Sequence, residues 1–213
     1  MNKRLFIFVI IGAVLLRLGV VLMMGDKIEV LPGIYDQISY HTLATRLLSG
    51  HGFTFAQDWW PMTQAGEPTA HWSYLYTLYL TVVYQVVGIH PLATRIIQAV
   101  AVGILMPWLA YRLGKRVFPG VSVTLLRLKW DVGMVAALWI AFYGYFIYYA
   151  AALMTESFYI TGILWVLDCS VRMAQDHSRD GKSLMRWIEL GLATGVTVLL
   201  RQVFLLVLPV LLA

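Results

Sequence analysis

The stretch LFIFVIIGAVLLRLGVVLMM, Leu5–Met24, decides the class of protein to which this chain belongs. Its 20 residues match the length that an α-helix needs to cross the hydrocarbon core of a bilayer, and Arg17 is its only charge. Because Lys3 and Arg4 precede the run, a secretory signal peptide is the alternative. The run is long for the apolar core of a signal peptide, and no small-residue cleavage motif closes it. We therefore predict an uncleaved first membrane span.

Further apolar runs exclude a soluble globular domain. Hydrophobic residues occupy 60% of the 213 positions and charged residues 13%, about half the share in a soluble domain. The runs are Trp72–Gly88, Leu92–Leu113, Val132–Leu153, Ser157–Val171 and Trp187–Ala213. The last run contains Arg201 and Pro209, which predicts one span, a short turn and the start of another span. We predict an all-α, polytopic transmembrane helical bundle in which residues 1–213 form one module. Because its last run is still apolar at Ala213, we expect a C-terminally truncated chain.

The distribution of Lys and Arg predicts the orientation, because cytoplasmic loops are enriched in these residues. Lys3 and Arg4 place the N-terminus in the cytoplasm, so residues 25–71 form the first external loop. Two later connections are strongly basic, at residues 112–129 and 172–186, and should also be cytoplasmic. The net charge of +5 is therefore a feature of membrane topology and does not indicate nucleic-acid binding.

This orientation requires one apolar run to stay on one side of the membrane, because the first basic connection would otherwise lie outside. The run Trp72–Gly88 is the better candidate, since it is short and rich in tyrosine, which favours the membrane surface. If Trp72–Gly88 does not cross the membrane, Asp36, Glu156 and Arg201 share the external face. If it does cross, Asp36 lies on the opposite face from the other two.

The first external loop contains an amphipathic segment, IYDQISYHTLATRLLSGHGF, which we expect to lie along the membrane as a short helix. One face of this helix carries Tyr40, Leu43, Ala44 and Leu47. Ser49-Gly50 predicts the helix end, and Asp36 lies four residues before Tyr40 on the same face. Asp36 is either a helix N-cap or a functional carboxylate near the lipid headgroups, and the two roles are compatible.

Three other polar residues are candidates for a site at the membrane boundary. Glu156 is either solvated at the interface or a second acid that orients an acceptor or binds a metal ion. Arg201 interrupts an apolar run, so it either extends to the headgroups or binds a phosphate, whose oxygens match a guanidinium. His71 closes the external loop and is either a ligand or base, or an interfacial packing residue.

The remaining charges in apolar runs have simpler interpretations. Arg17 reaches either the outer headgroups or a carboxylate, and Asp168 and Arg172 are spaced for an ion pair along one helix. No metal-binding spacing, glycine-rich phosphate loop or serine-nucleophile motif is present in the sequence.

The order of these residues resembles that in the GT-C superfamily of membrane glycosyltransferases, close to protein O-mannosyltransferases and aminoarabinose transferases (glycosyltransferase family 39-like). A family pattern D-x-x-x-Y-x-x-L-A-x-x-L-x-x-G-x-G-F is matched by Asp36, Tyr40, Leu43, Ala44, Leu47, Gly50, Gly52 and Phe53. Further matches follow in order at Pro68-Thr69-Ala70, Gly88, Arg95, Gln98, the basic RLGKRVF, Thr155-Glu156 and Leu200-Arg201. Gln37, Trp72-Ser73-Tyr74 and Gln202 depart from the pattern, which bears on the donor sugar and the subfamily.

The resemblance implies transfer of a sugar, with inversion, from a polyprenyl-phosphate donor to a protein, lipid or glycan acceptor. Asp36 would be the general base, and Glu156 would orient the acceptor or bind a divalent metal, which only some members use. Tyr40, His71 and Arg201 would bind substrate, with Arg201 at the lipid phosphate. The enzyme would be a multi-pass protein of a bacterial plasma membrane, within the cell envelope, surrounded by membrane lipids.

Two other classes of protein remain as alternatives. A transporter or lipid flippase would commonly show inverted repeats or interrupted helices with paired charges, and no repeat is evident here. A non-catalytic membrane scaffold would leave Asp36 freely replaceable.

Overall fold

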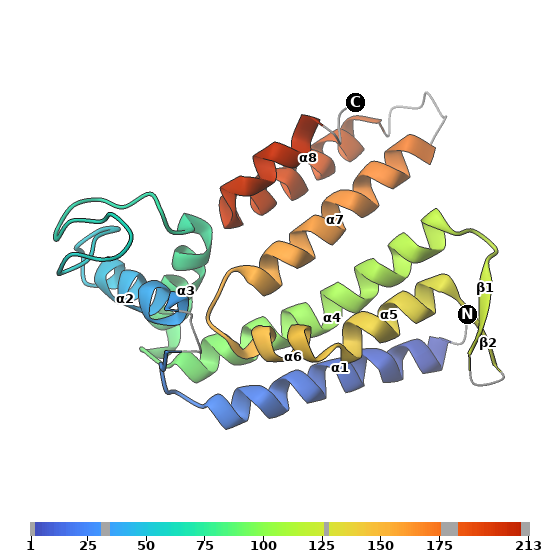
Figure 1. Ribbon diagram of the computed structural model, residues 1–213, viewed down its shortest axis with the longest axis horizontal. Helices are drawn as coiled ribbons and strands as arrows, with labels where there is room; N and C mark the ends of the chain where they lie inside the picture. The colour runs from blue at the N-terminus through green and yellow to red at the C-terminus, as the bar shows by residue number, and fades with distance from the viewer. Residues whose placement is uncertain (1–2, 31–34, 126–127, 176–182, 210–213) are drawn as a thin grey trace.

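The computed structural model describes all residues except 1–2, 31–34, 126–127, 176–182 and 210–213. Its elements, in chain order, are α1 (Lys3–Met24), α2 (Asp36–Leu48), α3 (Tyr74–Val87), α4 (Pro91–Val117), β1 (Ser122–Leu125), β2 (Leu128–Asp131), α5 (Val132–Phe142), α6 (Gly144–Ala151), α7 (Glu156–Gln175), α8 (Ser183–Leu200) and the 3₁₀ helix η1 (Gln202–Val207). Figure 1 shows α1, α4, α5 and α6 packed together, α7 and α8 on one side of them, and α2 and α3 at one end. The chain is mostly helical, as predicted.

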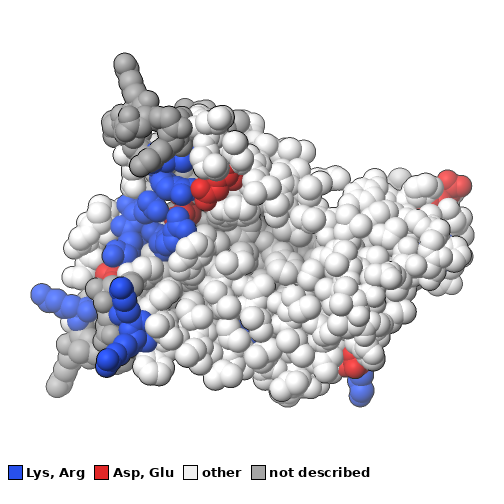
Figure 2. All heavy atoms as spheres, turned by 180° about the vertical axis from the view of Figure 1, so that it is seen from behind, with Lys and Arg blue, Asp and Glu red and all other residues white. Residues whose placement is uncertain are grey.

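Two of the described helices, α1 and α4, are long and apolar enough to cross a membrane, and the bent pair α5–α6 adds a third if it forms one span. Helix α3, in the run predicted to stay on one side, has 14 residues and is shorter than a full crossing. Helices α7 and α8 are also predicted spans, but each carries charged residues along its length. On the face drawn in Figure 2, charged side chains gather at the two ends, with hardly any between them. Membrane association is therefore supported, and the orientation remains a prediction.

A β-hairpin between α4 and α5 departs from the all-α prediction. Strands β1 and β2 are antiparallel, with Val123 opposite Trp130 and Thr124 opposite Lys129. Valine, threonine and tryptophan favour extended backbone. Strands of 4 residues are nevertheless too short to show a period of two within a basic loop, so the pattern was not recognised in the sequence.

The run Val132–Leu153, predicted as one span, is broken at Tyr143, where α5 and α6 meet at a bend of 51°. The carbonyls of Ile140 and Ala141, at the end of α5, accept hydrogen bonds from the Arg17 guanidinium at 3.1 and 3.0 Å. Arg17 is fully buried, so the prediction that it reaches headgroups or a carboxylate was wrong. The break supplies the acceptors that a buried guanidinium needs in an apolar layer.

The predicted ion pair between Asp168 and Arg172 was also wrong. Asp168 lies 2.6 Å from Arg112 and 2.8 Å from Arg116, both on α4. Arg172 lies 2.5 Å from Glu189 of α8 instead. A spacing of four residues permits a pair along one helix, but each charge finds a partner on a neighbouring helix here.

Glycines allow α4 and α5 to pack closely. A Cβ atom on Gly133 would lie 2.5 Å from the carbonyl oxygen of Tyr111, a separation that van der Waals radii forbid. A Cβ atom on Gly114 would lie 2.8 Å from the Cα atom of Gly133. The packed end of α4 is thereby held in place, and its opposite end carries the polar residues that position the candidate site.

Candidate active site

Asp36 is the first residue of α2. The N-cap position belongs to Tyr35, whose side chain makes no capping hydrogen bond, so the N-cap interpretation of Asp36 was wrong. The Asp36 side chain is half-buried, and no described residue forms a hydrogen bond with its carboxylate. Helix α2 ends after Leu48, and Gly50 has a φ of 81°, as the Ser49-Gly50 prediction requires. An acidic residue in the first turn is favoured by the helix dipole, which leaves the carboxylate available for other partners.

The predicted apolar face of α2 packs on the start of α3. Tyr40 is buried, and its ring makes edge-to-face contacts with Trp72 at 5.4 Å and with Tyr76 at 4.9 Å between centroids. Its hydroxyl accepts a hydrogen bond from the backbone N–H of Ser73 at 3.4 Å. Because Asp36 lies one turn before Tyr40, this packing sets the position of the Asp36 carboxylate.

Glu156 and Arg201 form an ion pair between two helix ends. Glu156 begins α7, and Arg201 lies at the break between α8 and η1, in an extended conformation with φ −149°. The Nε atom of Arg201 also donates to the Thr155 hydroxyl at 3.1 Å. The second carboxylate oxygen of Glu156, Oε2, is buried and has no hydrogen-bond partner among the described residues. The structure thus brings together two of the predicted site residues and leaves one acceptor atom unused.

Asp36 and Glu156 both line one cavity of about 730 Å³, which we call the aromatic cavity. Six aromatic side chains form most of its remaining wall: Tyr35, Trp59, Trp60, Trp72, Tyr145 and Tyr149. The indole N–H of Trp72 is buried and has no partner among the described residues. The aromatic cavity therefore offers flat apolar faces and two carboxylates.

A second cavity of about 530 Å³, which we call the arginine cavity, adjoins the first. The two cavities share Asp36, Trp60 and Trp72. The arginine cavity adds Tyr40, His71 and Arg201, together with the apolar end of α8 and the start of η1. All five predicted site residues therefore line one cavity or the other, and Asp36 lines both.

Burial is the largest influence on the pKa values of Asp36 and Tyr40, the two titratable residues of α2 at this site. It raises the pKa of Asp36 above the value of a solvated carboxyl group, although the positive charge of Arg201 acts in the opposite direction. Burial also raises the pKa of Tyr40 to about 12, so its hydroxyl stays protonated. Asp36 is consequently a stronger base than an exposed aspartate, and Tyr40 is a neutral neighbour.

Gln37 positions Asp36, and sequence reasoning assigned it no role. Its Oε1 atom accepts hydrogen bonds from Arg95 Nη2 at 3.0 Å and from the backbone N–H of Leu153 at 2.9 Å. Arg95 also donates to the carbonyl of Gly25, where the external loop begins, and to that of Ala151, at the end of α6. This network ties α2 to α4 and to the segment that leads into Glu156.

Gln98 holds the same segment from the next turn of α4. Its Nε2 atom donates to the carbonyls of Ala150 and Ala152 at 3.0 and 2.7 Å, and its Oε1 atom accepts from the Tyr76 hydroxyl. In the sequence, Arg95 and Gln98 served only to support the family resemblance. Polar residues inside an apolar helix were the signal that could have identified them as positioning residues.

No group of three or more His, Cys, Asp or Glu side chains in the described part of the chain could hold a metal ion. The optional divalent metal therefore remains a prediction that rests on the resemblance. Comparisons with protein-family models, with curated proteins and with solved structures found no match for this chain. The fold and the site define a mostly helical, membrane-associated protein with a carboxylate between two cavities.

Proposed function

We propose that this chain is the catalytic part of a membrane glycosyltransferase of the GT-C type. It would move a sugar from a polyprenyl-phosphate carrier to an acceptor hydroxyl at the outer face of a bacterial plasma membrane. One observation carries the proposal: Asp36 has no described hydrogen-bond partner and lies where the aromatic cavity meets the arginine cavity. A general base needs this position, between the group that loses a proton and the bond that breaks.

The proposed reaction gives these residues the following roles. The acceptor hydroxyl gives its proton to Asp36 while its oxygen attacks the anomeric carbon of the donor. The bond between that carbon and the phosphate oxygen breaks, and its electron pair stays on the polyprenyl phosphate. Attack from the side opposite the leaving group inverts the configuration at the anomeric carbon. The raised pKa of Asp36 favours proton acceptance.

Arg201 is suited to the phosphate of the donor. A guanidinium has five N–H donors, and the described bonds of Arg201 to Thr155 and Glu156 leave others for a ligand in the arginine cavity. The ion pair with Glu156 fixes the orientation of the guanidinium before the donor binds. A charged donor held in this way stabilises the negative charge that develops on the leaving phosphate.

The aromatic cavity suits a sugar ring or a polar acceptor chain. The apolar face of a sugar ring packs on aromatic rings, and its hydroxyl groups need acceptors and donors at the edge. Asp36 and Glu156 line this cavity and supply carboxylate acceptors for such hydroxyl groups.

The experiment is a transfer assay in proteoliposomes, with a panel of radiolabelled polyprenyl-phosphate sugars and a membrane extract as the source of acceptor. We expect label to pass from the lipid to the acceptor fraction with the wild-type protein and not with Asp36→Asn. Asp58→Asn is the matched control, because Asp58 is an exposed carboxylate of the same loop that only accepts from Ala65 N–H. Equal transfer by wild type and Asp36→Asn would refute the proposal.

The bend between α5 and α6 is the observation that favours the alternative, a transporter or lipid flippase, since such proteins contain interrupted helices. The carbonyls at that bend are already bound by Arg17, however, and neither cavity includes them. The same proteoliposomes separate the two functions. Redistribution of the labelled lipid between leaflets without transfer of label would indicate a flippase.

A further inference from the structure

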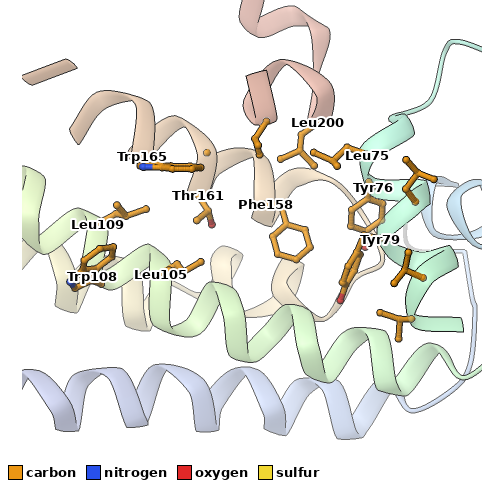
Figure 3. A pocket seen from close by; sticks show the side chains of 15 residues that line it. Leu75, Tyr76, Tyr79, Leu105, Trp108, Leu109, Phe158, Thr161, Trp165 and Leu200 are labelled. Carbon is orange, nitrogen blue, oxygen red and sulfur yellow. The ribbon is translucent and has the colours of Figure 1, made fainter. Parts of the chain in front are cut away.

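An apolar groove lies among α3, α4, α7 and α8 and adjoins the arginine cavity, with which it shares Leu200 (Figure 3). Its volume of about 770 Å³ falls within the range of about 300–1,000 Å³ that small-ligand sites occupy. The hydroxyl groups on its wall are already bonded within the protein: Tyr76 to Gln98, Tyr79 to Thr94 and Thr161 to Ser157. An occupant of this groove therefore has to be apolar.

Trp108 and Trp165 lie at one end of the groove, and Tyr76 and Tyr79 lie at the other (Figure 3). Arg112 follows Trp108 by one helical turn, and its guanidinium carbon lies 4.5 Å from the centre of the indole ring. Trp165 donates to Glu189 at 3.3 Å. Both tryptophans are thus linked to charged residues, which places this end of the groove at the boundary between an apolar and a polar layer.

The charge at this end is positive. Asp168, with 1% of its side chain exposed, is the carboxylate that both Arg112 and Arg116 contact. The two arginine side chains are 24% and 30% exposed, so they reach the surface, and their contact with one carboxylate leaves one positive charge over among the described residues of this charge cluster. Figure 2 shows Lys and Arg gathered at the end of the molecule that carries the β1–β2 hairpin in Figure 1.

An apolar groove that ends at tryptophans and then at a surplus guanidinium matches the order of groups in an anionic phospholipid. We propose that the groove binds one anionic glycerophospholipid, with an acyl chain along α4 and α7 and its phosphate at Arg112 and Arg116. Guanidinium groups match phosphate oxygens in geometry and charge, which favours this class of lipid over a neutral one. Neither Asp36 nor Arg201 lines this groove, and only the exclusion of a polyprenyl phosphate rests on the proposed transfer reaction.

The phosphate end distinguishes this lipid from other occupants. A polyprenyl phosphate also combines an apolar chain with a phosphate, but the proposed reaction needs its phosphate beside Asp36 and Arg201. A diacyl lipid with a neutral headgroup would fill the groove without using the surplus charge at Arg112 and Arg116. The positive charge therefore carries the assignment to an anionic glycerophospholipid.

The test is native mass spectrometry of the purified protein, titrated with phosphatidylglycerol, phosphatidylcholine and a polyprenyl phosphate. We expect one tightly bound phosphatidylglycerol and weaker binding of phosphatidylcholine. Arg112→Gln should reduce the preference for phosphatidylglycerol about tenfold, as expected for the loss of one charge-assisted hydrogen bond. The double variant Arg112→Gln/Asp168→Asn has the net charge of the wild type at this cluster, so it should regain most of the preference.

A groove-filling variant keeps the test independent of the charge cluster. Leu105 lines the groove and is partly exposed, so Leu105→Trp should block the acyl chain while all charges stay in place. We expect this variant to keep its unfolding temperature and to lose bound lipid of both classes. Equal binding of phosphatidylglycerol and phosphatidylcholine by the wild type, unchanged phospholipid binding by Leu105→Trp, or loss of polyprenyl-phosphate binding in Leu105→Trp would each overturn the proposal.

Discussion

Arg201 forms an ion pair with Glu156 across the open end of the hairpin made by α7 and α8. The carboxylate is 14% exposed and the guanidinium is 40% exposed, so the pair is buried on the glutamate side and open on the arginine side. An ion pair of this kind fixes the orientation of the guanidinium and leaves it accessible to a ligand. It also means that changing Arg201 alone leaves a buried carboxylate without its counter-ion.

Asp36→Asn should abolish sugar transfer and leave the protein folded. An amide cannot accept the acceptor proton, and general-base catalysis contributes about two to four orders of magnitude in rate. Because burial raises the pKa of Asp36, its ionised form is disfavoured in the folded state, so the neutral amide should not lower stability at neutral pH. Transfer assays beside thermal unfolding of the same preparation measure both effects. A stable variant with near-normal transfer would remove Asp36 from the mechanism.

Transfer should depend on pH through Asp36. The base acts when ionised, so activity should rise with pH through the raised pKa of Asp36 and reach its plateau above it. Arg201 lowers that pKa, so Arg201→Gln should move the acidic limb of the profile to higher pH. The matched control is Lys129→Gln, at an exposed residue of β2, which should leave the limb unchanged. An unmoved limb in Arg201→Gln would show that another group titrates.

Arg201 should contribute to donor binding and not only to packing. Arg201→Lys keeps the charge but loses the planar set of donors, so we expect a higher KM for the polyprenyl-phosphate sugar with normal membrane insertion. Arg201→Leu/Glu156→Gln removes both charges and avoids the unpaired carboxylate. If this double variant kept the wild-type KM for the donor, extension of Arg201 to the headgroups would be the better interpretation.

The side-chain oxygen of Gln37 should stabilise the fold, because it accepts two buried hydrogen bonds. Gln37→Leu would leave Arg95 and the Leu153 N–H short of a buried partner, at a cost of about 1–3 kcal/mol for each group. For a chain of this size, that cost lowers the unfolding temperature by about 2–4 °C per kcal/mol. Gln37→Glu is the matched control, because a carboxylate still accepts both bonds and pairs with Arg95. Equal unfolding temperatures for the Leu and Glu variants would show that the network does not stabilise the fold.

The orientation can be tested by cysteine labelling in a Cys169→Ser background. Gln64 lies exposed in the external loop, and Thr124 lies exposed in the β-hairpin of the basic connection. We expect an impermeant reagent to label Gln64→Cys in intact cells and Thr124→Cys only after permeabilisation. The opposite result for either position would reverse the membrane orientation on which the external site depends.

Several features follow from local sequence alone. Helices α1 and α4 are recognisable by length and apolar composition. The buried face of α2, with Tyr40, Leu43 and Ala44, follows from helical periodicity. Arg201 and Pro209 within the last apolar run predicted a turn in that run, and α8 indeed ends at Leu200, before η1. Each of these features depends on residues within a few turns of one another, so no knowledge of the packing is needed.

The partners of the buried charges could be decided only by the tertiary structure. Arg17 binds the carbonyls of Ile140 and Ala141, more than a hundred positions away. These carbonyls lie at a helix break that contains no proline, so no local sequence signal predicts the break. Asp168 contacts arginines of α4 and not Arg172, because helices α4 and α7 bring those cations closer. The meeting of two cavities at Asp36 likewise depends on how α2, α7 and α8 pack. Periodicity relates residues up to about four positions apart, whereas the pairing of distant polar groups depends on which helix faces pack together.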